Sequence, residues 1–195
     1  TKPTAHSCST IIAAWASLET PEAAAQAQIV YDSIDDSKLQ KDTGVQNALL
    51  KAWAASGDNA AVSKCLEILR SMQHPDEISY NTVLSAHPTP KQQEGFLQSW
   101  REQHSKDSSL PAPTLVSFNI ILHAWSVQGH VERATQVLEF LRKNPKMKPD
   151  VFSYTSVLDA WAKCQRPDKA DNARELLQKM PKSMRQSTII PYNTV

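Results

Sequence analysis

The sequence has little glycine and little cysteine. Only 4 glycines occur in 195 residues, and the chain contains no P-loop, no GxGxxG fingerprint and no GxSxG elbow, so the common nucleotide-binding and hydrolase motifs are absent. No apolar run approaches the roughly 20 residues that a membrane-spanning helix needs. The 3 cysteines lie far apart without CxxC spacing, which favours buried, reduced thiols in an intracellular protein. They are Cys8, Cys65 and Cys164.

Neither the net charge nor the potential metal-binding side chains indicate a catalytic or metal site. The net charge is only +1, which is low for a nucleic-acid binder, and the 6 histidines show no metal-ligand spacing. Asp35 and Asp36 lie in a Ser-flanked stretch, which favours a solvated turn over a metal site. The basic run 142–148 closes an expected helix, where cations suit the helix dipole, although a phosphate site is the alternative. We therefore expect no catalytic residue, no metal, no cofactor and no small-molecule substrate.

An apolar pattern recurs along the chain with a period in the mid-thirties. In one copy Tyr154, Val157, Leu158 and Trp161 fall at i, i+3, i+4 and i+7, which is one face of an α-helix. A repeat of this length is typical of a helical solenoid. We expect the rings of Trp125 and Trp161, at the i+7 position of their helices, to be buried. Each copy ends on Ala followed by a ring, and the rings are Trp15, Trp53, His87, Trp125 and Trp161.

A second amphipathic helix follows the first in each repeat. Turn signals such as Gly57-Asp58 and Gly129-His130 separate the two helices, and breakers such as Lys148-Pro149-Asp150 follow the second. In the third repeat we expect the second helix at about 91–104 and a surface linker at 105–114. Neither helix can bury its apolar face alone, so the hairpins must stack as one array. The predicted repeats are 5–42, 43–76, 77–114, 115–150 and 151–188, with a truncated sixth from 189 to 195.

The later repeats resemble the pentatricopeptide repeat (PPR). The resemblance covers nearly the whole chain, but it is weaker in the first two repeats, where Cys8 and Gln46 replace the usual Tyr or Phe. The tetratricopeptide repeat fits less well, because it has a stricter period and lacks the Val-x-Tyr-Asn-Thr start. The PPR resemblance implies an all-α, right-handed superhelical solenoid of stacked helix-turn-helix hairpins whose first helices line the concave face. The segments that carry it are Ile78–Leu84, Val116–Leu122, Lys148–Leu158 and Pro191–Val195.

The resemblance also implies binding of single-stranded RNA, with one base read by each repeat. The base edge is contacted by the residue after the aromatic position and by the last residue before the next repeat. An Asn amide both donates and accepts, whereas an Asp carboxylate only accepts and favours a base with a donor on its pairing edge. The alternative for the Asn residues is capping of a helix start. The implied pairs are Ser9 with Asp42, Asn47 with Asp76, Asn81 with Thr114, Asn119 with Asp150 and Thr155 with Thr188, and Asn193 opens the truncated repeat.

Two further roles follow from the resemblance. The second residue of each repeat packs between successive bases, a role for which His6 and Gly44 are unsuited. A Lys just past the first helix often meets phosphate in this family, and only Lys163 fills that position here. We therefore expect a small electrostatic contribution to binding. The residues suited to packing between bases are Ile78, Val116, Phe152 and Ile190.

At the level of the family, the resemblance implies a role in organellar RNA processing, stability or translation, in a mitochondrion or a plastid. The rival hypothesis is a PPR-like solenoid that binds proteins as a scaffold subunit of a ribonucleoprotein complex. Because the sequence lacks an initiator Met and ends inside a repeat, we expect it to be a fragment. A catalytic domain outside this segment, which some members of the family have, is a further alternative. The expected partners are single-stranded RNA and other ribonucleoprotein subunits, without a membrane.

Overall fold

The computed structural model describes residues 4–186, and across them the regular structure is entirely α-helical. The predicted site residues Thr188, Ile190 and Asn193 lie outside the described residues. None of the described helices is long and apolar enough to span a membrane. The chain divides into two compact units, one formed by Thr1–Pro88 with Gly95–Ala112 and the other by Thr89–Glu94 with Pro113–Val195.

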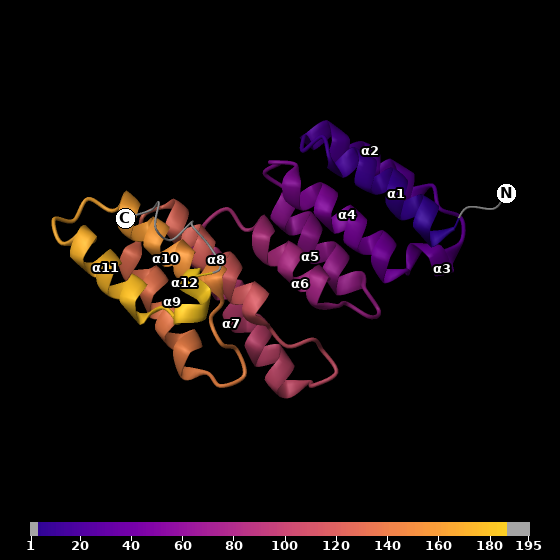
Figure 1. Ribbon diagram of the computed structural model, residues 1–195. Coiled ribbons are helices and arrows are strands. Elements are labelled where there is room, and N and C mark those ends of the chain that lie inside the picture. Colours follow the sequence, from indigo (N-terminus) through magenta and orange to yellow (C-terminus); the bar gives the residue numbers. More distant parts are fainter. Residues whose placement is uncertain (1–3, 187–195) are drawn as a thin grey trace. The chain divides into compact units, whose positions relative to one another are not determined.

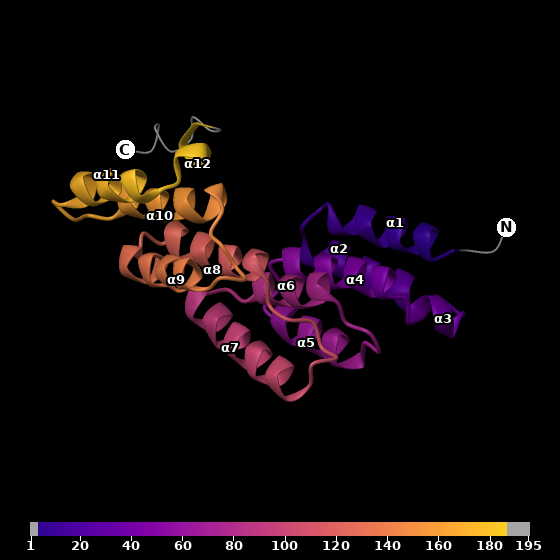
Figure 2. The same ribbon diagram turned by 60° about the horizontal axis from the view of Figure 1, so that its bottom comes forward.

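The first unit is built from stacked helical hairpins. Helices α1, α4 and α6 lie side by side, and α2 and α5 pack against them (Figures 1 and 2). The core between them is aliphatic, with Ile12, Leu49, Leu50 and Val83 fully buried. The helices are α1 (Ala5–Ala16), α2 (Pro21–Asp32), α3 (Ser37–Gln40), α4 (Thr43–Ala55), α5 (Ala61–Ser71), α6 (Glu77–Ala86) and α7 (Pro90–Lys106), of which α7 contributes to both units.

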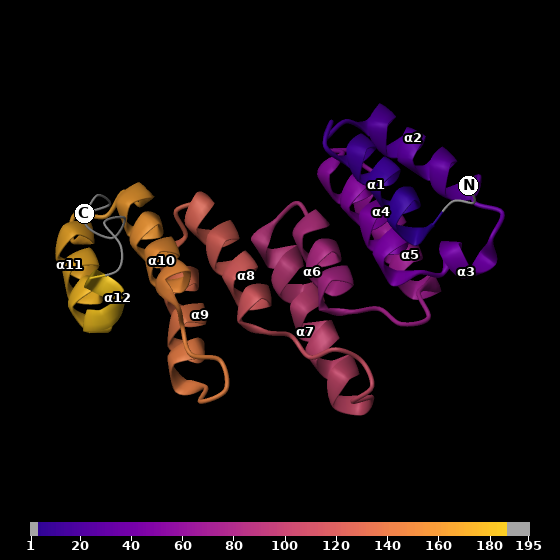
Figure 3. The ribbon, with the colours of Figure 1, turned by 45° about the vertical axis from the view of Figure 1, so that its right-hand side comes forward.

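The second unit repeats this arrangement. Helix α8 lies beside α10, α9 packs against both, and α11 packs against α10 (Figure 3). Leu122, Leu138 and Leu158 form its fully buried centre. These contacts match the predicted all-α stack of helical hairpins. The helices are α8 (Leu115–Val127), α9 (Val131–Lys143), α10 (Val151–Lys163), α11 (Lys169–Lys179) and α12 (Lys182–Gln186).

The first helix of every predicted repeat starts at a side-chain N-cap. The cap oxygen accepts a hydrogen bond from a backbone N–H that would otherwise lack a partner. In all but α4 a Ser three residues later returns a hydrogen bond to the cap residue, which completes a capping box. The caps are Thr4, Asp42, Asp76, Thr114 and Asp150.

The turn glycines and the cysteines lie as the sequence predicts. Gly57 and Gly129, between the two helices of a hairpin, have φ of 68° and 67°, a left-handed conformation that glycine adopts without steric cost. The three cysteines are buried and free. The second helix of the third repeat, α7, is slightly longer than predicted. The short helix α3 was not predicted.

The tryptophans are buried to different extents. Trp125 is only 7% exposed, and its indole Nε1 donates to Glu94 Oε1 at 2.7 Å. Trp161 is half-buried, so the expectation that its ring is buried is wrong. The Arg166 guanidinium covers that ring, with its carbon 5.5 Å from the ring centroid, and this cation–π contact replaces burial beneath another helix.

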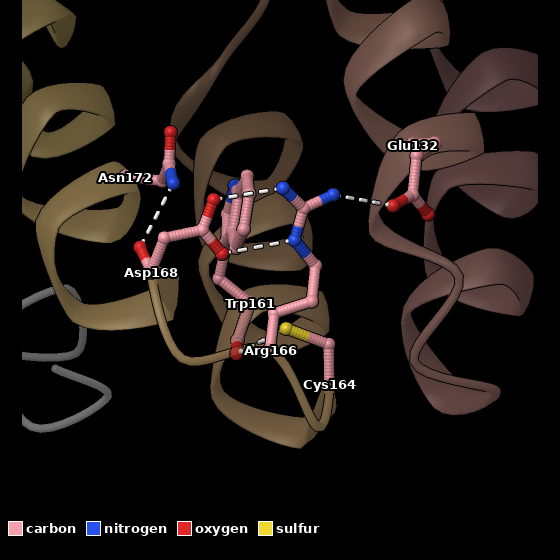
Figure 4. Close-up of polar contacts among 6 residues, drawn as sticks. All are labelled: Glu132, Trp161, Cys164, Arg166, Asp168 and Asn172. Carbon is pink, nitrogen blue, oxygen red and sulfur yellow. Dashed lines mark hydrogen bonds and ion pairs between the residues drawn. The ribbon is translucent and has the colours of Figure 1, made fainter.

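Arg166 also ties the turn after α10 to the preceding hairpin (Figure 4). Its Nε and Nη2 donate to Asp168 at 2.9 and 2.7 Å, and its Nη1 donates to Glu132 of α9 at 2.8 Å. The hydrogen bonds to Asp168 and Glu132 raise the pKa of the guanidinium. The cluster is therefore a structural link between successive turns.

Candidate functional site

Two copies of one polar cluster occupy equivalent places in the two units. In the first, Asn47 Nδ2 donates to Asp76 Oδ1 and Oδ2 at 3.1 and 3.2 Å, and Ser79 Oγ donates to Asn47 Oδ1 at 2.7 Å. In the second, the distances for Asn119 and Asp150 are 3.2 and 3.4 Å, and Ser153 Oγ lies 2.7 Å from Asn119 Oδ1. We call each copy an Asn–Asp–Ser cluster.

Secondary structure positions each cluster. The Asn is the fifth residue of a first helix, α4 or α8, while the Asp is the N-cap of the next first helix, α6 or α10. The Ser is the third residue of that next helix and closes its capping box. Each cluster therefore joins two successive first helices, and the need to cap a helix fixes the orientation of the carboxylate.

The hydrogen bonds within a cluster leave two groups for a ligand. Asp76 Oδ1 accepts from the Ser79 backbone N–H at 2.8 Å and from Asn47 Nδ2, and it lies 2.9 Å from Ser79 Oγ, whose single hydrogen it shares with Asn47 Oδ1. Oδ2 accepts the longer Asn47 contact, and the Ile78 backbone N–H also bonds to this carboxylate. The amide nitrogen carries two hydrogens, and within the described residues it contacts this carboxylate alone. An amide N–H and a carboxylate oxygen therefore remain side by side.

The carboxylate of the first cluster stays ionised at neutral pH. Burial tends to raise the pKa of Asp76, but hydrogen bonds from the Ser79 backbone, Asn47, the Ser79 hydroxyl and the Ile78 backbone outweigh burial and lower it. An ionised carboxylate can only accept hydrogen bonds. A ligand group that approaches Oδ2 must therefore donate.

Exposed apolar side chains lie near the clusters. Ile78 is 62% exposed, Val116 54% and Phe152 48%, and each is the second residue of its helix, α6, α8 or α10. Single exposed apolar side chains are ordinary on protein surfaces, and five others occur among the described residues, so exposure alone does not distinguish these three. Their recurrence at one helical position is the placement predicted for residues that pack between bases.

Comparisons with known proteins agree with the helical-repeat fold. The family model described as "Pentatricopeptide repeat domain" matches residues 112–164, and the one described as "PPR repeat" matches residues 152–183. The crystal structure of the pentatricopeptide repeat protein PPR10 from maize superposes with a TM-score of 0.64 at 19% identity, covering 99% of this chain and 26% of that one. By these matches, residues 112–183 belong to the pentatricopeptide repeat family.

Two curated PPR relatives come from Arabidopsis thaliana. "Pentatricopeptide repeat-containing protein At3g09650, chloroplastic" is 25% identical over 115 residues, which is 56% of this chain and 14% of the relative. "Pentatricopeptide repeat-containing protein At5g18475" is 29% identical over 102 residues, 51% of this chain and 20% of the relative. The chain thus spans a fifth or less of the length of these relatives.

The structure brings together only some of the residue pairs that the PPR resemblance implies. Asn47 meets Asp76, and Asn119 meets Asp150. No hydrogen bond joins Ser9 to Asp42 among residues 4–186. Ser9 Oγ instead donates to the His6 carbonyl at 3.0 Å, and Asp42 caps α4 by accepting from the Val45 N–H at 3.1 Å.

The remaining predicted contact residues are placed individually. Asn81 Nδ2 donates to Glu77 Oε1 at 3.3 Å in the first unit, and Thr114 caps α8 in the second. Thr155 Oγ1 donates to the Val151 carbonyl of its own helix at 3.0 Å. The partner predicted for Thr155 lies beyond residue 186.

The structure also decides the capping alternative for the Asn residues. Asn47, Asn81 and Asn119 lie inside α4, α6 and α8, where they cap nothing. The capping hypothesis for them is therefore wrong. The predicted partners Asp76, Thr114 and Asp150 are the caps.

Sequence reasoning missed the serines of the clusters. Ser79 and Ser153 are fully buried, and each links a cap to the preceding first helix. The Asp-x-x-Ser spacing is a sequence pattern that could have predicted a capping box. Their bonds to Asn47 and Asn119 depend on the stacking of hairpins, which the spacing alone does not give. Among the described residues no group of three potential metal ligands comes together.

Proposed function

We propose that this PPR chain binds single-stranded RNA sequence-selectively, one base per hairpin, through its first helices. The observation that carries the proposal is the recurrence of the Asn–Asp–Ser cluster with nearly the same distances at two equivalent places. A polar arrangement needed only for stability could take different forms in different hairpins. Each cluster presents the same amide donor and carboxylate acceptor. Such repetition suits a polymer ligand that presents one base edge per unit.

The chemistry of the cluster favours particular bases. Uracil presents an N3–H donor beside carbonyl acceptors, which complements a carboxylate oxygen next to an amide N–H. Cytosine and adenine place an acceptor at the corresponding ring nitrogen, which would face the lone pairs of Asp76 or Asp150. Guanine shares the donor pattern of uracil, and the preference for the pyrimidine rests on the family resemblance.

The exposed apolar residues complete the proposed base pocket. Ile78, Val116 and Phe152 would each pack between successive bases. Only Phe152 among them is aromatic, and stacking of a base on such a ring is worth about 1–3 kcal/mol and tolerates any base. In this scheme the apolar side chains supply affinity, and the clusters supply selectivity.

The proposed register follows the predicted division into five hairpins. Read 5′ to 3′, the repeats should prefer guanine, uracil, a pyrimidine, uracil and a purine. At the second and fourth positions the clusters favour uracil or guanine, and the family resemblance selects uracil. The remaining assignments come from Ser9 with Asp42, Asn81 with Thr114, and Thr155 with Thr188. Lys163 occupies the position at which this family often contacts phosphate.

Competition between single-stranded and double-stranded RNA tests the proposal. One base per hairpin requires unpaired base edges, so we expect a single-stranded oligonucleotide to bind more tightly than the duplex formed with its complement. Fluorescence anisotropy with both forms at the same salt concentration measures the difference. Equal or tighter binding of the duplex would reject the proposal and favour a scaffold that binds proteins within a ribonucleoprotein.

Binding should depend only mildly on salt. Few Lys or Arg occupy the expected phosphate positions, so ~2–3 phosphates should be neutralised, at ~0.7 per phosphate in the slope of log K against log salt. We expect a slope near −2 by this estimate. Affinity measured over a salt series checks this, and a slope steeper than about −5 would reveal a basic groove that the proposal omits.

The biological setting is part of the same proposal. One relative is named as chloroplastic, and the family resemblance implies RNA processing, stability or translation in a plastid or mitochondrion. We propose an organellar role of this kind. Because the chain spans a fifth or less of its curated relatives, other ribonucleoprotein subunits could bind elsewhere in the parent protein.

A further inference from the structure

An ion pair lies at the proposed phosphate position of the second unit. Lys163 Nζ donates to Asp159 Oδ2 at 2.6 Å, and Ser126 Oγ of α8 donates to the same oxygen, also at 2.6 Å. Ser126 is fully buried, so its hydroxyl needs this acceptor. Asp159 is therefore held both by its own helix, α10, and by α8.

The ion pair occupies the same side of α10 as the proposed RNA contacts. Phe152, Thr155, Asp159 and Lys163 follow one another at spacings of three or four residues, which aligns them along one face of a helix. We call these four residues the reading stripe of α10. A strand that contacts Phe152 and Thr155 and reaches Lys163 must pass Asp159.

Asp159 carries its negative charge at neutral pH. Burial raises the pKa of its carboxyl group, but hydrogen bonds from Lys163 and Ser126, together with the nearby charges of Lys163 and His123, lower it overall. The nearby imidazole of His123 also lies against the Phe152 ring, with centroids 6.1 Å apart. A phosphate group that approaches Lys163 therefore meets a carboxylate on the same ammonium.

We infer that Asp159 withholds Lys163 from the RNA backbone, so that this hairpin contributes little electrostatic affinity. The inference rests on the proposed function and deepens it. Asp159 acts here as a positioning residue, because it acts on RNA through Lys163. It makes binding depend more on base contacts and less on nonspecific attraction to phosphates.

The test replaces Asp159 with its uncharged near-isostere. In Asp159→Asn the amide oxygen can still accept from Ser126, so the contact between α8 and α10 is retained, and a thermal melt checks folding. The matched control is Glu175→Gln on α11, where Lys179 Nζ lies 2.6 Å from Glu175 at the same i,i+4 spacing. Both variants remove one negative charge from a Lys pair, but only Asp159 lies on the reading stripe.

The measurement is the affinity for a single-stranded oligouridylate over a salt series. One additional phosphate contact steepens the salt slope by ~0.7, which corresponds to about fivefold tighter binding at about 0.1 M salt. We expect this gain for Asp159→Asn and a change of less than about twofold for Glu175→Gln. Equal gains in affinity in the two variants, or no gain in either of them, would overturn the inference.

Lys163→Met in both backgrounds isolates the lysine. It should have little effect on affinity when Asp159 is present and should abolish the gain when Asn replaces it, a coupling that a double-mutant cycle measures. Equal losses in the two backgrounds, with RNA still bound, would overturn the inference alone. Absence of single-stranded RNA binding in the unaltered chain and in Asp159→Asn would overturn the proposed function, and the inference with it.

Discussion

Trp125→Ala is expected to lower the free energy of unfolding by about 3–5 kcal/mol. The ring is 7% exposed, its Nε1 donates to Glu94, and His130 packs edge-on against it with centroids 5.3 Å apart. Truncation would leave a cavity beside α8 and remove the hydrogen-bond partner of Glu94. Urea unfolding followed by circular dichroism measures the change, and binding of single-stranded RNA below the melting transition should be unchanged.

Trp161→Ala is the matched control for this substitution. Its ring stands at the same place in the repeat but is half-buried and covered by Arg166, so its loss should cost clearly less. If the two variants lost the same free energy of unfolding, the burial of a ring would not determine the cost of removing it. Unchanged unfolding of Trp125→Ala with lost RNA affinity would instead make Trp125 a platform on which bases stack.

Asn119→Thr is expected to shift the preference of one hairpin from uracil toward guanine. The shorter side chain leaves more room beside Asp150, and guanine can donate from both N1–H and its exocyclic amine to that carboxylate. A good pair of hydrogen bonds to a base edge discriminates by about 1–3 kcal/mol. Affinities for oligonucleotides that differ only at the fourth position measure the shift.

Asn47→Thr provides the control, because the same substitution in the other cluster should move the second position and leave the fourth alone. Both variants should fold, since the caps Asp76 and Asp150 and their bonds to Ser79 and Ser153 remain. A loss of overall affinity in Asn119→Thr without any change in preference at a single base would refute the assigned register.

The periodic apolar pattern was sufficient to predict the hairpins. It placed Leu122 and Leu158 on buried helix faces, and the glycines of the turns at Gly57 and Gly129, because these features depend on spacing along one chain segment. The resemblance also predicted that Asn47 pairs with Asp76, which the structure brings into hydrogen-bonding contact. Their contact to RNA stays a prediction, as does the division into five repeats.

Other features depend on contacts between helices and could not be read from the chain. The half-buried state of Trp161 reflects Arg166, which crosses from the following turn to contact α9 through Glu132. The ion pair between Asp159 and Lys163 was not predicted, and the bond from Ser126 to Asp159 requires the stacking of α8 on α10. In both cases a side chain of one hairpin forms a hydrogen bond or an ion pair with a side chain of the next hairpin.

Selection from a random pool of single-stranded RNA tests the central claim, that each Asn–Asp–Ser cluster reads one base, most directly. The clusters lie in the second and fourth hairpins, so the account predicts enrichment of uracil at two positions separated by one nucleotide. Enrichment of adenine or cytosine at those two positions, or bound RNA without any positional preference, would contradict it.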